Sequence, residues 1–204
     1  GGFIGSNLAE KIASISPTDH IFSLMRKKLS VNLENNNHHL IILGDITSKD
    51  VIIKATKNID VVFHLAAKTS EKTSESKESY RTNVEGTKNL IKACLKNKVK
   101  HLIIVSSQST KRQQRGFYGE TKRLADVEVA KIPLSSKLKY TIVKPTIVYG
   151  RGSKGLFAKI LTLMCKLPVV PIIGSGNYEL QPIYIDDLTT ALLTIANNPK
   201  TFGK

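Results

Sequence analysis

The sequence predicts an α/β protein built on a doubly wound parallel sheet, with a smaller, partial lobe for substrate. Short runs of valine, isoleucine and leucine alternate with longer segments of helical period, the pattern of crossover helices that cover a parallel sheet. These runs are apolar at nearly every position, as expected for strands buried on both faces. A glycine-rich turn, Gly2-Phe3-Ile4-Gly5, opens the first helical segment. We therefore predict a sheet domain at 1–145 and a partial lobe at 146–204, whose own strand and helix return to the core.

Five strands and five helices are expected to follow one another. The strands are predicted where the apolar runs are most continuous, at residues 21–25, 40–43, 61–65, 102–105 and 140–143. The helices are predicted where apolar residues recur every three or four positions, at 4–14, 75–97, 118–131, 155–165 and 187–196. Asn97, Pro133 and Pro199 fall where helices should end. The polar segment 68–79 is expected to be an exposed loop that could cover a site.

Length and composition indicate a protein without a membrane span. The chain has 204 residues, of which 41% are hydrophobic and 23% charged, and Lys166, Pro168 and Pro171 break the longest apolar stretches. Cys94 and Cys165 are too few and too far apart for a disulfide framework or a zinc site. We expect no metal, a reducing compartment and a cytoplasmic location.

Both ends of the chain suggest a fragment of a longer protein. The first residue is Gly1 rather than methionine, and the chain begins inside the glycine-rich turn with no strand before it. The last residues, Thr201 to Lys204, stop without a capping signal after a helical segment. The sheet domain is therefore expected to lack its first strand.

The formal net charge of +15 favours a small anionic ligand over nucleic acid. Lys111, Arg112 and Arg115 form a small basic cluster. Elsewhere the lysines are scattered, with no aromatic residues interleaved to stack on bases. We therefore expect no nucleic-acid partner.

The glycine-rich turn is a candidate pyrophosphate site. Gly2 and Gly5 would let the backbone of Gly2-Phe3-Ile4-Gly5 bring its amides against a pyrophosphate at the helix N-terminus, although close helix packing is an alternative reason for two glycines. At the end of the next strand Arg26 stands where an acidic residue would receive a ribose 2'-hydroxyl. The cofactor is therefore predicted to be NAD or NADP, with a slight preference for NADP; a solvated basic turn is the alternative interpretation of Arg26.

Two further strand ends complete the predicted cofactor site. Asp45 and Ile46 follow the second of the listed strands, where Asp45 could accept from an adenine amino group or could cap the following helix. Leu65, Ala66 and Ala67 follow the next strand, where small side chains would let a dinucleotide approach the backbone. The sequence leaves both uses of Asp45 open.

Tyr118 and Lys122 are candidate catalytic residues. They stand four positions apart, on one face of the predicted helix 118–131. A phenol titrates near pH ~10, so a tyrosine can act as a base near neutrality only where a fixed cation stabilises its charged form. Lys122 is placed to supply that cation, although such pairs also occur on solvated helix faces.

Taken together, these residues resemble the extended short-chain dehydrogenase/reductases, and among them the NAD-dependent epimerase/dehydratase group that acts on nucleotide sugars. The resemblance runs almost from end to end and implies a Rossmann domain. It rests on motifs that appear in the family's order: Gly2-Phe3-Ile4-Gly5, Gly44-Asp45-Ile46, His64-Leu65-Ala66-Ala67, Asn83-Val84-Glu85-Gly86-Thr87, Val105-Ser106-Ser107, Tyr118 to Lys122, Lys144-Pro145-Thr146-Ile147-Val148-Tyr149-Gly150 and Tyr184-Ile185-Asp186-Asp187.

The resemblance implies a role for each residue of the site. Tyr118 is expected to be the catalytic acid/base, and Lys122 to bind the nicotinamide ribose and lower the tyrosine pKa. Ser107 is expected to orient the substrate. Ser106 is expected to pack near the nicotinamide, and Pro145 to line its pocket.

Three other positions are interpreted through the same resemblance. Asn83 is expected to be structural, within its helix, and His64 to be structural at the end of its strand. Lys144 stands where the family often has arginine. None of the three is assigned to the predicted site.

Departures from the family pattern limit the predicted chemistry. Gln108 and Ser109 stand where family dehydratases usually carry an acidic pair, so dehydration is disfavoured. Leu180 stands where epimerases commonly place an arginine for the nucleotide diphosphate. Gln181, which follows it, and Arg151 are candidate substrate contacts, although Arg151 is also explained as a solvated loop charge.

The sequence thus predicts an NAD(P)-dependent epimerase or oxidoreductase that acts on a nucleotide-activated sugar through hydride transfer. One alternative is a one-way NADPH-dependent reductase of a keto-sugar or another small carbonyl. Another is a non-catalytic scaffold that binds NAD(P). A homodimer is possible, because the family often dimerises through helices that correspond to 75–97 and 118–131.

Overall fold

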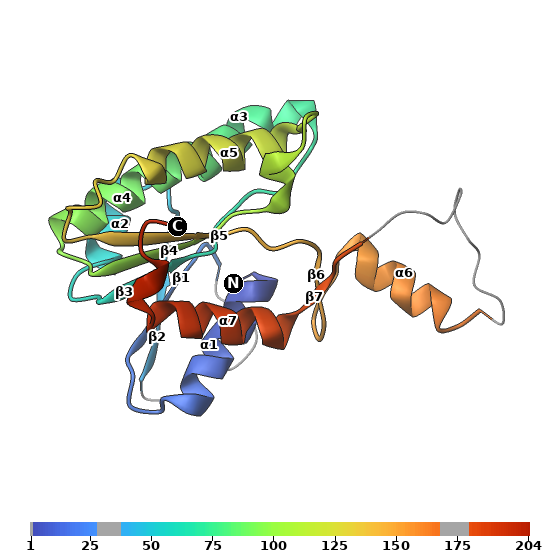
Figure 1. The fold of residues 1–204 in the computed structure, drawn as a ribbon, viewed down its shortest axis with the longest axis horizontal. Coiled ribbons are helices and arrows are strands. Elements are labelled where there is room, and N and C mark those ends of the chain that lie inside the picture. Colours follow the sequence, from blue (N-terminus) through green and yellow to red (C-terminus); the bar gives the residue numbers. More distant parts are fainter. Residues whose placement is uncertain (1, 28–37, 168–179) are drawn as a thin grey trace.

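Parallel strands form the middle layer of the molecule, and helices cover both of its faces (Figure 1). The computed structural model describes residues 2–27, 38–167 and 180–204. Helices α3, α4 and α5 lie on one side of the strands, and α1 and α7 lie on the other (Figure 1). This is the three-layer arrangement expected when crossover helices connect parallel strands.

The five long strands are those predicted from the apolar runs. They are β1 (Ile21–Met25), β2 (His39–Leu43), β3 (Val61–His64), β4 (His101–Val105) and β5 (Lys139–Val143). β1 pairs in parallel with β2, and β4 lies between β3 and β5, parallel to both. Among the described residues β1 and β3 are not paired with each other, so these strands form a pair and a triplet.

The helices connect these strands in turn. Those that cover the sheet layer are α1 (Phe3–Ile15), α2 (Lys49–Ala55), α3 (Ser76–Tyr80), α4 (Gly86–Lys96), α5 (Phe117–Ala130) and α7 (Ile185–Ala196). The lobe that follows β5 contains α6 (Leu156–Met164) and the short parallel pair β6 (Val148–Tyr149) and β7 (Ile183–Tyr184). Short 3-10 turns occur at Thr73–Glu75, Gln108–Lys111 and Pro199–Thr201.

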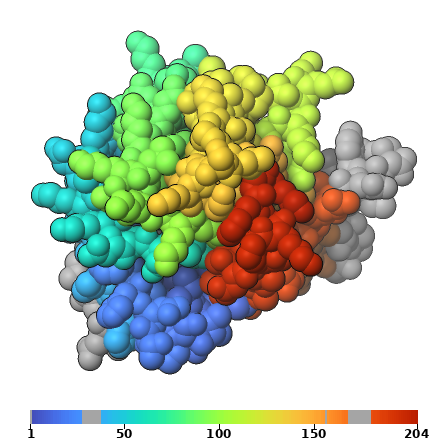
Figure 2. All heavy atoms as spheres, turned by 60° about the vertical axis from the view of Figure 1, so that its left-hand side comes forward, coloured from blue at the N-terminus to red at the C-terminus, as the bar shows by residue number. Residues whose placement is uncertain are grey.

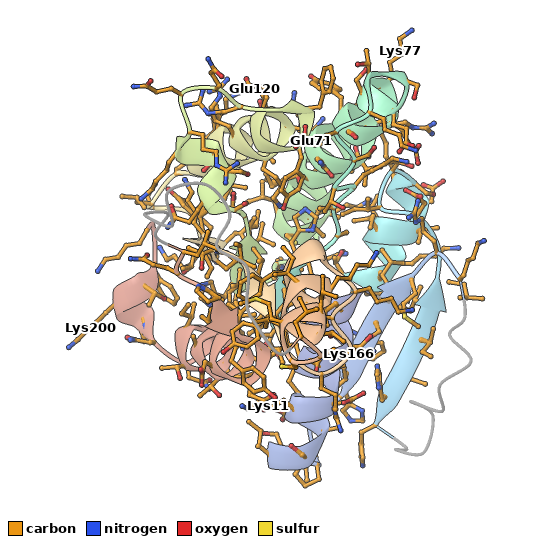
Figure 3. The ribbon with its side chains drawn as sticks, turned by 90° about the vertical axis from the view of Figure 1, so that its right-hand side faces the viewer. Lys11, Glu71, Lys77, Glu120, Lys166 and Lys200 are labelled. Atoms are coloured by element: carbon orange, nitrogen blue, oxygen red, sulfur yellow. The ribbon has the colours of Figure 1, made fainter. Side chains whose placement is uncertain are left out.

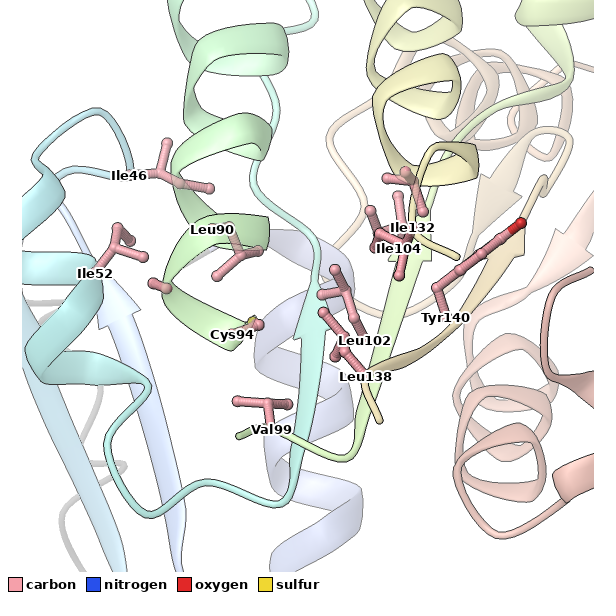
Figure 4. Packing of buried hydrophobic residues seen from close by; sticks show 12 residues of the cluster. Ile46, Ile52, Leu90, Cys94, Val99, Leu102, Ile104, Ile132, Leu138 and Tyr140 are labelled. Atoms are coloured by element: carbon pink, nitrogen blue, oxygen red, sulfur yellow. The ribbon is translucent and has the colours of Figure 1, made fainter. Parts of the chain in front are cut away.

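The larger apolar cluster lies between the strands and helices α2, α4 and α5 (Figure 4). From β4 it includes Leu102 and Ile104, both fully buried. Alternate β4 residues point to the same face because the side-chain period of a strand is two. The other members are Ile46, Ile52, Leu90, Ala93, Cys94, Val99, Val129, Ile132, Leu138 and Tyr140.

A second apolar cluster lies on the opposite face of β4. It consists of Leu8 from α1, Ile103 and Val105 from β4, and Leu188 and Leu192 from α7. The C-terminal residues continue past α7 along the edge of β5, where two backbone hydrogen bonds, each of 2.8 Å, join 203–204 to 140–142. The red C-terminal segment accordingly lies against the yellow residues that carry β5 in Figure 2. Helix α7 therefore packs against the sheet.

The predicted fold is confirmed, with three local differences. Helix α2 was not predicted, because its seven residues are too short for a clear helical period. The predicted helix 75–97 is divided, since a π-helical turn at Arg81–Glu85 separates α3 from α4. Strand β3 ends at His64 rather than at residue 65. The division into domains at residue 145 stays a prediction.

Two negative observations apply to the described part of the chain. No helix there combines the length and the apolar character that a membrane crossing requires. No group of three or more His, Cys, Asp and Glu side chains there is arranged to hold a metal ion.

Candidate active site

The predicted site residues gather at the carboxyl ends of β3, β4 and β5, close to the N-terminus of α1. Gly2 is the N-cap of α1, and a side chain at this position would meet no atom within 4 Å. A Cβ on Gly5 would lie 3.5 Å from Leu65 Cδ1, so the first turn of α1 packs on the segment that follows β3. The glycine-rich turn therefore presents helix amides at an open position beside the strand ends.

The segment that follows β3 is held by Asn83. The Asn83 amide accepts from Lys68 N at 2.8 Å and donates to Lys68 O at 3.0 Å and to Thr121 Oγ1 on α5 at 2.9 Å. Asn83 is buried and lies in the π-helical turn, a rare feature that often occurs at functional sites. Sequence reasoning assigned Asn83 a structural role within its helix, whereas the structure shows it joining two elements of the site.

His64 lies below this link and is fully buried. Its Nε2 is 2.8 Å from Thr87 Oγ1, and Thr87 in turn donates to Asn83 O at 2.6 Å. Burial, aided by the nearby Lys122 cation, lowers the pKa of His64 to about 3. His64 is therefore neutral near pH 7, consistent with the structural role expected for it.

Ser106 and Ser107 continue directly from β4. Ser106 N donates to Val143 O at 2.7 Å, while Ser106 Oγ is buried and has no hydrogen-bond partner among the described residues. Ser107 caps the following 3-10 turn, and its Oγ accepts from Ser109 N at 3.2 Å. Gln108 N donates to Pro145 O at 3.1 Å. Both serines and Pro145 thus lie together at the ends of β4 and β5.

Tyr118 lies in the first turn of α5, with its hydroxyl near enough to the Ser107 hydroxyl for that group to influence its pKa. Burial is the largest influence on the Tyr118 pKa and raises it, as do the carboxylates of Asp126 and Glu71, while the nearby Ser107 hydroxyl lowers it. The net effect is a raised pKa. In this structure Tyr118 is therefore a protonated donor near neutral pH.

Lys122 lies one turn further along α5 and is 2% exposed. Its Nζ donates to Val105 O at 2.7 Å, which ties the helix to the end of β4. Burial lowers the pKa of Lys122 to about 8, against the opposing influence of the Asp126 carboxylate. The predicted lowering of the tyrosine pKa by Lys122 is not seen in this structure, because burial of Tyr118 dominates and Lys122 bonds to the strand.

Glu71 is a neighbour of the site that sequence reasoning missed (Figure 3). Its carboxylate accepts from Tyr118 N at 3.4 Å, at the N-terminus of α5, where a negative charge is favourable. A Cβ on Gly116 would collide with this carboxylate. The polar segment 68–79 indicated an exposed loop, and nothing in its spacing marked Glu71 as the residue that reaches α5.

The predicted adenosine side of the site contains a mixed charge cluster. Asp45 Oδ1 accepts from Thr47 N at 2.8 Å, whereas Ser48 is the N-cap of α2. Burial raises the pKa of Asp45, but the Thr47 hydrogen bonds and the Arg26 and Arg81 cations outweigh it, and the pKa is lowered. Asp45 is therefore an anion that does not occupy the N-cap position of the next helix.

Three other predicted residues lie in different surroundings. The Ile46 side chain is buried in the larger apolar cluster, so only its backbone is open to a cofactor role. Arg151 is exposed and lies 3.3 Å from Glu10 on α1. Gln181 is exposed, and its carbonyl oxygen accepts from Thr146 Oγ1. No described contact joins Arg151 or Gln181 to Ser107, Tyr118 or Lys122, so their predicted contact with substrate stays a prediction.

Comparison with known proteins decides the family. The NAD dependent epimerase/dehydratase family matches residues 1–204, the whole chain. The chain belongs to this family. A UDP-glucose 4-epimerase from Vibrio cholerae is 27% identical, with 98% of this chain and 65% of that protein covered. A 3-beta-hydroxysteroid dehydrogenase from Mycolicibacterium neoaurum is 24% identical, with 97% of this chain and 59% of that protein covered. The chain thus spans roughly three fifths of the length of these relatives.

Solved structures of the family share the fold. A dTDP-glucose 4,6-dehydratase from Streptomyces venezuelae, solved with NAD bound, has a TM-score of 0.80. It is 17% identical, and the match covers 97% of this chain and 70% of that one. The family resemblance and the α/β fold expected from the sequence are therefore confirmed. The family and these relatives comprise NAD-dependent enzymes of several activities.

Proposed function

We propose that the protein is an NAD(P)-dependent epimerase or oxidoreductase of a nucleotide-activated sugar, with Ser107, Tyr118 and Lys122 as its catalytic residues. The observation that carries the proposal is the convergence of these three side chains at the end of β4. The Ser107 hydroxyl is near enough to Tyr118 to lower its pKa, and Lys122 bonds to Val105 O, two residues before Ser107. A hydroxyl donor, a second hydroxyl and a buried amine thus surround one strand end.

The residues present fit a dinucleotide. Gly2 leaves the N-terminus of α1 open, where its backbone amides would hold a pyrophosphate. Ser106 Oγ, buried and without a partner among the described residues, is suited to a polar group of the nicotinamide end. When bound, the nicotinamide supplies hydride acceptance from the carbon that carries the substrate hydroxyl.

The chain's own residues supply proton transfer and orientation. Ser107 Oγ orients the sugar hydroxyl beside the Tyr118 oxygen. In its deprotonated form this oxygen takes the hydroxyl proton as the keto-sugar forms, and the protonated Tyr118 returns it in the reverse step. Lys122 is placed beside this tyrosine by the i, i+4 spacing on α5. A lysine ammonium has three donors, of which Val105 O uses one. The other two are available to hydroxyl groups at the site.

The nucleotide sugar is proposed from the relatives rather than from a described contact. The UDP-glucose 4-epimerase is one relative that matches nearly all of this chain. Gln108 and Ser109, in place of an acidic pair, favour epimerisation or simple oxidation over dehydration. The similarity to a 3-beta-hydroxysteroid dehydrogenase supports a one-way oxidoreductase as the second candidate function.

A preference for NADP is a separate proposal that favours the one-way reductase. It rests on Arg26, directly after β1, and on Arg81, two cations near enough to Asp45 after β2 to lower its pKa. A 2'-phosphate is recognised by arginine at this position of a dinucleotide fold. We expect NADP to bind more tightly than NAD, and Arg26→Ala to remove most of that difference.

Activity of the full-length gene product tests the proposal. Wild type and Tyr118→Phe would be incubated with UDP, GDP and dTDP sugars, with NAD and with NADPH, and Tyr80→Phe, an exposed tyrosine on α3, would be the matched control. We expect turnover by wild type and by Tyr80→Phe, and a loss of about 10²–10⁴-fold in Tyr118→Phe. Net NADPH consumption would favour the reductase, and interconversion of sugars without net consumption the epimerase. Cofactor binding without turnover on any carbonyl or sugar would instead support a scaffold.

A further inference from the structure

Asp126 continues the row of site residues on α5. Tyr118, Lys122 and Asp126 follow one another at intervals of four, which places them along one face of the helix. Asp126 is 7% exposed, and its Oδ2 lies 3.0 Å from Lys144 Nζ, directly after the end of β5. Neither carboxylate oxygen has a hydrogen-bond partner of regular geometry among the described residues. Asp126 is therefore a buried anion that forms an ion pair with Lys144. The proposed chemistry assigns no role to this carboxylate.

The charged and titratable groups that face Lys122 come from each element packed against it. Val105 O of β4 accepts its hydrogen bond, and His64 of β3, neutral near pH 7, is close enough to feel its charge. From α5 itself come Tyr118 and Asp126. Lys144, after β5, reaches Asp126. Among these described neighbours Asp126 supplies the negative charge.

We propose that Asp126 is a positioning residue whose buried carboxylate keeps Lys122 in its ammonium form at the end of β4, with Lys144 holding that carboxylate in place. The inference rests on the proposed function. Burial alone disfavours a charged lysine, and an opposite charge within about 4–6 Å restores it. A neutral amine would offer fewer donors to the site and no positive charge beside Tyr118. Lys144 is needed because an unpaired buried carboxylate would itself be unstable.

The first test measures the protonation of Lys122 directly. The full-length gene product would be labelled with ¹³C-lysine and the Lys122 signal followed by NMR as pH is raised, with Lys122→Met used to assign it. In Asp126→Asn we expect the titration midpoint of Lys122 to fall by about one pH unit or more. Asp126→Glu should restore the wild-type midpoint. Glu128→Gln is the matched control, because Glu128 is on the same helix but pairs with Lys131, and it should leave the midpoint unchanged.

The second test is the pH profile of kcat/KM for the same variants. In Asp126→Asn the loss of activity on the basic side should begin at lower pH, by the same interval as the NMR midpoint. Activity should therefore recover toward the wild-type value as the pH is lowered. A purely structural role would reduce activity equally at every pH.

Lys144→Met removes the other partner of the Asp126–Lys144 ion pair. It provides a second test if Asp126→Asn does not fold. With Lys144 removed, the buried Asp126 carboxylate loses the cation that holds it, its support of the Lys122 ammonium weakens, and the Lys122 midpoint should fall. Lys144→Arg keeps the cation and should change little. An unshifted Lys122 in folded Asp126→Asn, or an unchanged or raised midpoint in Lys144→Met, would overturn the role of Asp126 while wild type remains active. If wild type shows no turnover at all, the proposed function fails, and with it any role of Asp126 in the reaction.

Discussion

The two faces of the central strands differ in what they bury near the site. Toward α1 and α7 the buried side chains of β4 are Ile103 and Val105, which meet leucines of both helices. That face also buries a polar pair, His101 and Thr141, whose Nε2 and Oγ1 are 2.9 Å apart. This pair lies at the start of β4, the end away from the site.

Toward α4 and α5 the same strand ends meet a connected set of buried polar groups. Asn83 links the segment after β3 to α5, His64 bonds to Thr87, and Lys122 bonds to β4. The apolar cluster on this face lies around the middle and the starts of the strands. The comparison indicates that one face mainly supplies stability, while the other also fixes the groups of the site.

Leu192→Ala should have the largest effect on stability and none on the chemistry. Leu192 is fully buried in the α1 and α7 cluster. Removing such a side chain lowers the free energy of unfolding by about 2–5 kcal/mol. Denaturant unfolding checks the loss, and kcat/KM per folded molecule should stay at the wild-type value. A fall in activity well beyond the folded fraction would show that this face also shapes the site.

Asn83→Ala should damage both stability and the site. It removes both bonds to the Lys68 backbone and the link to Thr121, which costs about 1–3 kcal/mol for each buried group left unpaired. The Thr121 hydroxyl keeps its bond to Tyr118 O. Because the same bonds join the segment after β3 to α5, cofactor affinity and kcat should fall as well. The matched control is Asn89→Ala, which loses one bond of 3.2 Å to Thr47 O. Equal losses of cofactor affinity in the two variants would contradict the special role of Asn83.

The apolar face was predictable from the sequence to a greater extent than the polar one. The bounds of β4 and α1 were predicted to within one residue at each end, from the apolar run 102–105 and from the repeat of Ile4, Leu8 and Ile12. Burial of a strand or of one helix face leaves such a pattern in the sequence. The order of the motifs likewise placed Ser107, Tyr118 and Lys122 close together.

The links across the polar face were not predictable in the same way. The bond from Asn83 to Lys68 spans 15 residues and the bond to Thr121 spans 38, and no local period relates such positions. Glu71 was missed for the same reason, since tertiary packing brings it to α5. Asp126 stands at a regular interval of four after Lys122, but its burial and its pairing with Lys144 come from tertiary packing. The raised pKa of Tyr118 also depends on burial by elements distant in the sequence. The i, i+4 spacing of Tyr118 and Lys122 carries no information about that burial.

Mild acid should weaken the polar face through His64. Its pKa is about 3 in the folded protein against 6.5 for the free group, so between these values the unfolded chain takes up a proton that the folded protein excludes. The free energy of unfolding should therefore fall by about 1.4 kcal/mol for each pH unit below 6.5. The free energy of unfolding of wild type and of His64→Gln would be measured at pH 6.5 and 4.5. The difference between the two proteins in the slope of this free energy with pH gives the contribution of His64. A His64→Gln slope equal to wild type would show that His64 does not contribute.

Glu71→Gln should give the smallest effect, and it separates the electrostatics of the polar face from its packing. The Glu71 carboxylate contributes to the raised pKa of Tyr118, so replacing it with a neutral amide of the same shape should lower that pKa. The titration of the Tyr118 hydroxyl, followed by NMR of ¹³C-labelled tyrosine, should then move to lower pH, and the shift should be small because partly exposed charges are screened by solvent. Glu120→Gln is the control, since Glu120 pairs with Arg123 at 2.6 Å on the same helix and is not among the charges that act on Tyr118. A shift to higher pH, or the same shift in both variants, would mean that Glu71 only caps the helix and does not tune the tyrosine.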